Sequence, residues 1–177
     1  MLNNIMSDDL VILVDEFDDQ KGIASKMEAH QNGLLHRAFS VLILDYNRKM
    51  LLQQRALSKY HTGGLWSNAA CGHPRPDESI LDAANRRLME EMGIRGELRA
   101  LNCFIYRCVF SNKLIEYEYD HIFIADYTYS NDIKSNPYEV HDYKWMEIDD
   151  LKQDILKNPE IYTPWFKMIL ENPDIIL

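Results

Sequence analysis

The chain has 177 residues, of which 46% are hydrophobic and 27% charged, so it can bury one sizeable core. Its formal net charge of -9 argues against binding nucleic acid or an anionic membrane, because both attract positive surfaces. The apolar runs are too short to span a bilayer, and the N-terminus lacks a signal-peptide pattern. We therefore expect a cytoplasmic monomer with one domain over residues 1–177 and a core over about 26–168.

Predicted strands fall mainly in the first two thirds of the chain. Short apolar or alternating runs predict strands at 10–14, 38–45, 50–55, 67–70, 98–109, 115–125 and 143–146. Polar or Gly- and Pro-rich stretches predict turns or loops at 18–22, 46–49, 61–76 and 110–113.

The clearest predicted helix runs from Ser79 to Met92. Its apolar residues recur at helical spacing, at Leu81, Ala84, Leu88 and Met92. Gly93 follows as a helix end, and two further helices are expected at 148–157 and 164–171. Because helices interrupt the strands rather than alternate with them, the pattern favours an α+β sandwich over a doubly wound parallel sheet.

The three cysteines predict free thiols rather than a disulfide framework. Cys71, Cys103 and Cys108 are odd in number, and no two of them form a CxxC pair. A free cysteine is most often a small buried apolar residue. Neither Cys103 nor Cys108 shows any other role.

Two acidic residues lie at the end of the clearest helix, where the helix dipole disfavours them. One interpretation is that Arg86 and Arg87 neutralise Glu90 and Glu91 as helical ion pairs, which contribute only about 0.2 to 0.5 kcal/mol each. The other is that these carboxylates hold Mg²⁺ against a diphosphate, since Mg²⁺ prefers oxygen ligands shared between protein and phosphate.

A family resemblance supports the second interpretation. The segment Gly72–Glu78, followed by Arg86–Ile94, resembles the Nudix box, a loop-helix-loop signature for metal-bound diphosphates. The resemblance implies a Nudix-like fold of mixed β-sheets packed with helices. Arg87 departs from the pattern, because hydrolases of this superfamily carry a glutamate there. A guanidinium removes a metal or base group and adds a phosphate clamp, which disfavours pyrophosphate hydrolysis.

A pair of glutamates marks the predicted strand at 115–125. Glu116 and Glu118 are two residues apart, so both side chains project from the same face. Asp120 falls on that face too, so a solvated strand edge is one interpretation. A site that needs several carboxylates is the other.

Three histidines extend the resemblance to one family. A single histidine is more often a surface or hydrogen-bonded residue than a ligand. His30, His36 and His73, however, together with the glutamate pair, resemble the isopentenyl-diphosphate isomerases built on the Nudix fold. The resemblance implies that His30, His36, His73, Glu116 and Glu118 bind one Mn²⁺ or Zn²⁺, a donor set that suits either ion.

The same resemblance implies a site for the substrate diphosphate. Mg²⁺ would join the diphosphate through Glu91 and the backbone carbonyl of Cys71. Diphosphate contacts are implied for Lys26, Arg55, Lys59 and Arg87. From the residues alone, the segment Arg55–Lys59 leaves a strand and enters a loop, where side chains can converge on a ligand. Ordinary solvent exposure remains the alternative for the two lysines.

The implied reaction is a reversible 1,3-allylic proton shift that converts isopentenyl diphosphate to dimethylallyl diphosphate through a tertiary carbocation. An alkene is a weak base, so the reaction needs a strong acid in a dry pocket. Glu118, helped by Tyr106, is the candidate donor or relay, and Cys71 the candidate group for the allylic proton, although the direction can be reversed. Trp165 resembles the family's aromatic wall, with core packing as its alternative.

Two rival functions remain at this stage. One is a Nudix hydrolase that keeps Glu90 and Glu91 for Mg²⁺, and the other is a Nudix-like sensor that binds a diphosphate without turnover. We treat the remaining histidines as structural or surface residues: His61, His121 and His141.

Overall fold

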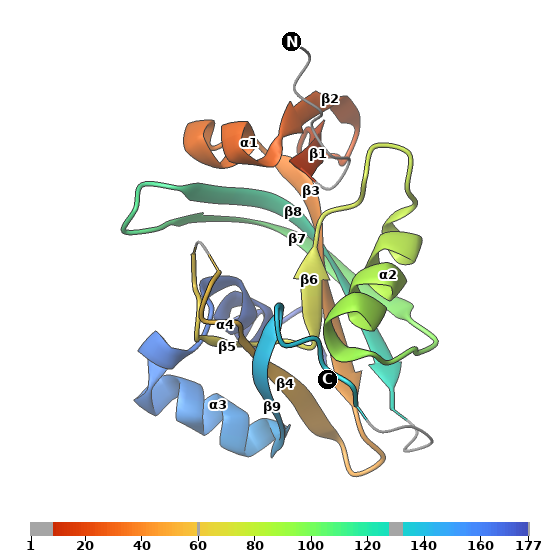
Figure 1. The fold of residues 1–177 in the computed structure, drawn as a ribbon, viewed down its shortest axis with the longest axis vertical. Coiled ribbons are helices and arrows are strands. Elements are labelled where there is room, and N and C mark those ends of the chain that lie inside the picture. Colours follow the sequence, from red (N-terminus) through yellow and green to blue (C-terminus); the bar gives the residue numbers. More distant parts are fainter. Residues whose placement is uncertain (1–8, 60, 128–132, 177) are drawn as a thin grey trace.

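The β-strands form one mixed sheet, which is the centre of the fold. The computed structural model describes residues 9–59, 61–127 and 133–176, and Figure 1 shows their arrangement. The strands are β1 (Leu10–Val14), β2 (Gln20–Ser25), β3 (His36–Leu44), β4 (Lys49–Arg55), β5 (Trp66–Ser67), β6 (Ala70–Gly72), β7 (Arg99–Val109), β8 (Ile115–Asp126) and β9 (Val140–Glu147).

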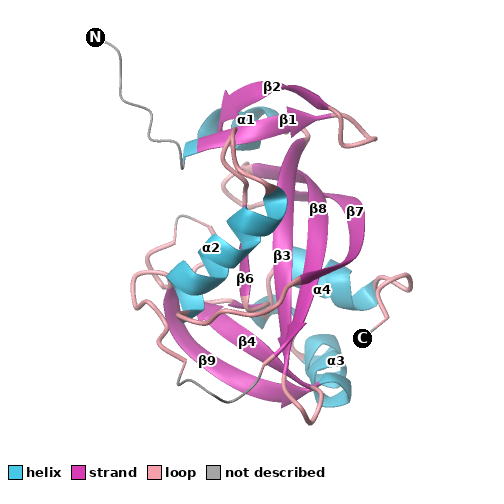
Figure 2. Cartoon of the chain, turned by 90° about the vertical axis from the view of Figure 1, so that its right-hand side faces the viewer, coloured by secondary structure: helices cyan, strands magenta, loops and turns pink. Residues whose placement is uncertain are grey.

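Helices cover the sheet on both sides, as Figure 2 shows. They are α1 (Lys26–Asn32), α2 (Ile80–Met92), α3 (Ile148–Lys157) and α4 (Pro164–Glu171), with a 3₁₀ turn at Pro159–Ile161. None of the helices in these described segments is long and apolar enough to cross a membrane.

Strand β3 organises the sheet. It pairs in parallel with β8 along its whole length, from His36 opposite Glu118 to Leu44 opposite Asp126, and antiparallel with β6. Strand β4 joins β3 only at Leu44 and Met50, and then pairs antiparallel with β9. The strands predicted at 38–45 and 50–55 therefore meet at the turn between them, but they then separate and take different partners.

The core lies on both faces of β3. Val41 and Ile43 belong to the cluster under α2, whereas Leu42 and Leu44 belong to the cluster under α3 and α4. Side chains alternate between the faces of a strand, so a continuous apolar run is what a strand covered on both sides requires. The sequence 41–44 meets this requirement.

Helix α2 forms where the sequence predicts it. The Ser79 hydroxyl accepts a hydrogen bond from the backbone N–H of Asp82 at the N-terminus, and Gly93 adopts φ +67° at the C-terminus. Leu81 does not belong to the buried face, because 42% of it is exposed, and the adjacent Ala83 is buried instead. The predicted helices at 148–157 and 164–171 are confirmed with the same bounds.

The region between β1 and β3 differs from the prediction. The turn expected at 18–22 is shorter, because β2 begins at Gln20 and pairs with β1. Helix α1 follows and was not predicted, since it buries only Ala29 and His30 and so has no apolar periodicity. The α+β fold itself is confirmed.

Gly93 is the position of this fold that tolerates a side chain least. A Cβ there would lie 2.5 Å from the backbone oxygen of Lys134, and its φ of +67° is strained for other residues. Gly93→Ala should lower the free energy of unfolding by more than about 1 kcal/mol, measured by urea denaturation. Gly22→Ala is the control, because its Cβ would meet only Leu13 Cδ1 at 3.9 Å. Equal losses in both variants would contradict the steric explanation.

Candidate active site

A cavity of about 310 Å³ lies where α1, the loop after β4, the segment after β6 and strand β8 meet. Cationic, anionic and aromatic side chains share its wall. Ten of the residues proposed from the sequence line it: Lys26, Arg55, Lys59, Cys71, His73, Arg87, Tyr106, Glu116, Glu118 and Trp165.

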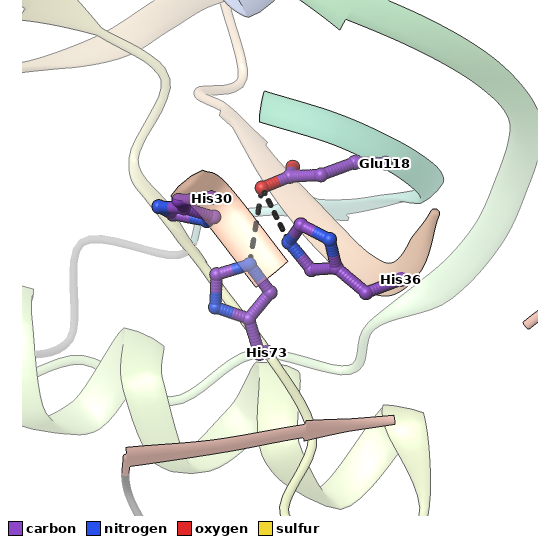
Figure 3. Close-up of side chains that lie close together, drawn as sticks. All are labelled: His30, His36, His73 and Glu118. Atoms are coloured by element: carbon purple, nitrogen blue, oxygen red, sulfur yellow. Dashed lines mark hydrogen bonds and ion pairs between the residues drawn. The ribbon is translucent and has the colours of Figure 1, made fainter. Parts of the chain in front are cut away.

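Three histidines and one glutamate gather beside this cavity. One ligand atom from each of His30, His36, His73 and Glu118 lies within 4.8 Å of the other three. The centroid of the His36 ring is 5.2 Å from that of His30 and 4.9 Å from that of His73. Figure 3 shows the imidazoles of His36 and His73 directed at the Glu118 carboxylate, with His30 beside them.

The backbone register brings this cluster together. The parallel pairing of β3 with β8 sets His36 opposite Glu118. The Nδ1–H of His36 donates to the carbonyl of Leu34 at 2.8 Å, which leaves Nε2 facing Glu118 Oε1 at 3.4 Å. Because a carbonyl can only accept, this bond fixes the tautomer whose Nε2 carries a lone pair for a metal.

The protonation states also suit a metal. Burial and the neighbouring histidines lower the pKa of His30 to about 2, and burial lowers that of His73 to about 4. Burial raises the pKa of Glu118, but the two neighbouring imidazoles of His36 and His73 outweigh it and hold the pKa well below its usual value. Neutral imidazoles and a carboxylate are the forms that bind divalent metals, so these four residues fit such an ion.

Glu116 lies next to this cluster rather than within it. Its Oε1 is 3.5 Å from His61 Nε2, and its Oε2 accepts a hydrogen bond from the Tyr106 hydroxyl at 3.4 Å. Glu116 and Asp120 are only 4% and 1% exposed, so the solvated-edge interpretation is wrong. Strand β8 lies between β3 and β7, so it is not an edge of the sheet. Burial and the charge of Glu118 raise the pKa of Glu116 well above its usual value.

The candidate proton carriers share the cavity wall. The Tyr106 hydroxyl donates to Glu118 Oε2 at 2.6 Å. Burial raises the pKa of the Cys71 thiol to about 12, although Arg55 Nη1 lies 3.9 Å from its sulfur and acts in the opposite direction. Trp165 is buried and lies under the Arg55 guanidinium, whose carbon is 5.3 Å from the ring centroid. A thiol, a carboxylate and an aromatic ring therefore surround one small space.

The predicted diphosphate contacts gather in the same cavity. Arg55 is almost fully buried, and no acceptor among the described residues lies within hydrogen-bonding distance of its Nε. Lys26, the first residue of α1, is half-buried, and the loss of water around it lowers its pKa. Cations withdrawn from water on a cavity wall are costly without an anion. The cavity thus suits an anionic ligand.

Both interpretations of the acids at the end of α2 find support. Arg86 Nη1 lies 3.3 Å from Glu90 Oε2, and Arg87 Nη2 lies 2.8 Å from Glu91 Oε1, so the helical ion pairs form. Glu91 is nevertheless buried and also accepts a hydrogen bond from Gln53 Nε2 at 2.6 Å. A buried carboxylate next to an anion-binding cavity is consistent with a metal-binding role as well.

His61 was missed as a cavity residue. It was expected to be structural or exposed, yet it is buried, lines the cavity and stacks on Phe110 with ring centroids 5.0 Å apart. Its position two residues after Lys59, in the same loop, was the available signal. His121 fits the structural expectation, because it pairs with Asp18 at 3.0 Å.

Comparison with known proteins identifies the family. The NUDIX domain family matches residues 34–166. A protein of Aromatoleum aromaticum named isopentenyl-diphosphate Delta-isomerase 2 is 48% identical, covering 93% of this chain and 86% of its own. One of the same name from Photorhabdus laumondii is 47% identical, covering 92% and 91%. The chain belongs to the isopentenyl-diphosphate Delta-isomerase family of NUDIX-domain proteins.

Solved structures agree at the level of the fold. The family member described here superposes on DR0079 from Deinococcus radiodurans with a TM-score of 0.73 over 92% of this chain and 97% of that one, at 14% identity. A MutT protein from Methanosarcina mazei gives a TM-score of 0.63 over 77% and 91%, at 19% identity. These identities are low, so the two structures establish the shared fold alone.

The histidine cluster predicts stabilisation by a divalent metal. Mn²⁺ at about 100 times its dissociation constant should stabilise chelator-treated protein by about 2.7 kcal/mol, since it binds the folded state. The thermal midpoint should rise by about 5 to 10 °C. His73→Ala should abolish most of this rise, whereas His141→Ala, an exposed histidine on β9, should keep it. An undiminished rise in His73→Ala would place the metal elsewhere.

Proposed function

We propose that this chain interconverts isopentenyl diphosphate and dimethylallyl diphosphate, moving the double bond by a 1,3-allylic proton shift through a tertiary carbocation. Membership of the isomerase family supports the reaction. The observation that carries the proposal for this chain is that Cys71 and Glu118 line one small cavity together with cationic side chains, of which Arg55 is buried. Such a cavity can hold a five-carbon diphosphate with its double bond between two proton carriers.

The charged end of the substrate determines its orientation. Arg55, with its buried Nε, and Lys26 offer donors to the cavity, and so do Lys59 and Arg87. Arginine matches phosphate oxygens with paired N–H groups. We infer that these four residues bind the diphosphate, which leaves the hydrocarbon tail against Trp165 and the reacting pair.

The resting protonation of the reacting pair suits a proton shift. With a pKa raised to about 12, Cys71 is a thiol at neutral pH, whereas Glu118 is a carboxylate. The Cys71 thiol can thus give a proton to the alkene while the Glu118 carboxylate takes one from the allylic carbon, and the reverse reaction returns both protons. The direction favoured from the sequence, with Glu118 as donor and Cys71 as acceptor, requires that one proton first move from the Cys71 thiol to the Glu118 carboxylate. The acid then gives a proton to the alkene and the thiolate takes one from the allylic carbon. The Tyr106 hydroxyl, 2.6 Å from Glu118 and 3.4 Å from Glu116, can relay protons to Glu118.

The carbocation needs stabilisation without a nucleophile. The Trp165 ring lines the cavity and can face a cation through its electron-rich surface, an interaction of about 0.5 to 2 kcal/mol. Arg55 already lies over this ring at 5.3 Å, so the carbocation would have to contact a part of the ring that Arg55 leaves uncovered. The reaction also requires that water be kept from capturing the cation.

Two metals complete the proposal. His30, His36, His73 and Glu118 would hold Mn²⁺ or Zn²⁺, with Glu116 as a fifth ligand, and Mg²⁺ would enter with the substrate at Glu91 and the Cys71 carbonyl. The gathering of these four residues and the lowered pKa values of His30 and His73 support the first site. When bound, such ions supply positive charge that neutralises phosphate and fixes carboxylates.

We further propose that the protein works as a cytoplasmic monomer of one domain that supplies isoprenoid biosynthesis. Its acidic composition and its free cysteines support this setting.

Purified protein given isopentenyl diphosphate with Mg²⁺ and Mn²⁺ should form dimethylallyl diphosphate, followed by proton NMR. The expected product carries the double bond at the internal position and keeps its diphosphate group. Release of inorganic phosphate or diphosphate would instead support a Nudix hydrolase. Unchanged substrate with measurable binding would support a sensor.

The two proton carriers should be indispensable. Cys71→Ala and Glu118→Gln should each lower kcat by a factor of at least about 1000, because each removes a group that carries a proton in the reaction. Circular dichroism should show unchanged folds. Cys108→Ala is the matched control, since Cys108 is a partly buried thiol on β7 outside the cavity lining, and it should keep full turnover. Near-normal rates in either active-site variant would refute the assigned roles.

A further inference from the structure

A carboxylate with no role in the proposed reaction connects two of the phosphate-binding cations. Glu139, the residue before β9, accepts a hydrogen bond from Arg87 Nη2 at 2.9 Å and pairs through the same Oε2 with the ammonium of Lys59. All three side chains line the cavity. A glutamate here is unexpected, because it adds negative charge to a wall that should bind an anion.

The backbone of Glu139 is fixed to both segments that carry the two cations. Its carbonyl accepts from the N–H of Ala56 at 2.9 Å, where β4 leads into the loop of Lys59. Its own N–H donates to Asn136, whose N–H in turn donates to the carbonyl of Glu91 at 2.8 Å, at the end of α2. The carboxylate is thus held at a defined place between the loop and the helix.

Glu139 leaves both cations able to bind a ligand. An ammonium has three N–H donors and a guanidinium has five, and Glu139 uses one of each. Arg87 also contacts Glu90 and Glu91, so it keeps partners without Glu139. Among the contacts described for Lys59, by contrast, Glu139 is the acid that holds its side chain. Lysine has a long flexible stem, so an unheld Lys59 must be ordered when the diphosphate binds.

We propose that Glu139 is a positioning residue, which holds the ammonium of Lys59 beside the guanidinium of Arg87 so that both meet the substrate diphosphate in one fixed arrangement. This inference rests on the proposed function, and it extends that function to a residue outside the set predicted from the sequence. The positioning residue touches neither the reacting carbon atoms nor the proton carriers.

The sign of the effect separates positioning from simple charge. If Glu139 acted only through its charge, its removal would make the cavity more positive and tighten binding of a diphosphate. If it positions the cations, its removal costs the order that it provides and weakens binding. We expect the second effect to prevail, because Glu139 contacts both cations directly and is itself held by the backbone.

Steady-state kinetics of Glu139→Gln test the proposal. The KM for isopentenyl diphosphate at saturating Mg²⁺ should rise about tenfold, while kcat changes less than about threefold, since preorganisation is lost but the proton carriers are intact. Glu147→Gln is the matched control, because Glu147 is the last residue of β9, the strand that Glu139 precedes, and also faces a lysine, Lys49, at 3.6 Å, outside the cavity lining. It should behave as wild type.

Titration calorimetry with inorganic diphosphate and Mg²⁺ gives a second measurement that needs no turnover. Glu139→Gln should weaken diphosphate binding about tenfold. In a Lys59→Met background the same substitution should change the binding less than about threefold, because one of its two partners is gone. If wild type bound diphosphate in this pattern but did not isomerise its prenyl ester, the proposed function would fail and the positioning role would stand. Glu139→Asp, which keeps the charge, serves if the glutamine variant does not fold, and it should weaken binding by an intermediate factor.

Three results would overturn the proposal. A lower KM or tighter diphosphate binding in Glu139→Gln would mean that the acid competes with the ligand. A KM increase that disappears at high Mg²⁺ would mean that Glu139 binds the metal. Equal effects with and without Lys59 would mean that the two side chains act independently.

Discussion

The parallel pairing of β3 with β8 is the constraint on which the site depends. It sets His36 opposite Glu118, and the strands around it bring His73 and Cys71 to the same end of the sheet. A slip of one residue in this pairing would turn every side chain of β8 to the other face. The apolar run at 122–125 fixes the register, because its alternate residues belong to two different core clusters. Packing that stabilises the fold therefore also determines the geometry of the chemistry.

Strand β8 carries three acidic residues whose burial lowers the stability of the fold. Glu116, Glu118 and Asp120 project side by side from one face and are buried. Each has a compensating contact: the Ser40 hydroxyl donates to Asp120 at 2.9 Å, the Tyr106 hydroxyl donates to Glu118 at 2.6 Å and lies 3.4 Å from Glu116, and His73 lies 3.0 Å from Glu118. Such contacts offset burial only in part, as the raised pKa values of Glu116 and Asp120 indicate. The remaining cost is the kind that function imposes on stability.

Local signals made much of this structure predictable. The Ser79 cap and Gly93 define α2, and the residues grouped from the family resemblance do line one cavity or its adjoining cluster. Helix α1 was not predicted because its sequence has no apolar stripe, although the Ser25 cap and Gly33 mark its two ends as Ser79 and Gly93 mark those of α2. Glu139 was missed for a different reason, since it is one of 28 acids and its partners are 80 and 52 residues away. Contacts of that length exist only once the chain has folded.

The order in which the cluster's members occur along the chain bears on how the protein is made. The three imidazoles belong to residues 30, 36 and 73, whereas the carboxylate comes from residue 118, on strand β8. This strand pairs with β3 in parallel. During synthesis the histidines leave the ribosome first, and they cannot form a complete coordination shell until Glu118 has emerged and β8 has docked. The growing polypeptide therefore cannot bind an ion with all four residues at an early stage. Loading with metal becomes a late event, coupled to completion of the central sheet.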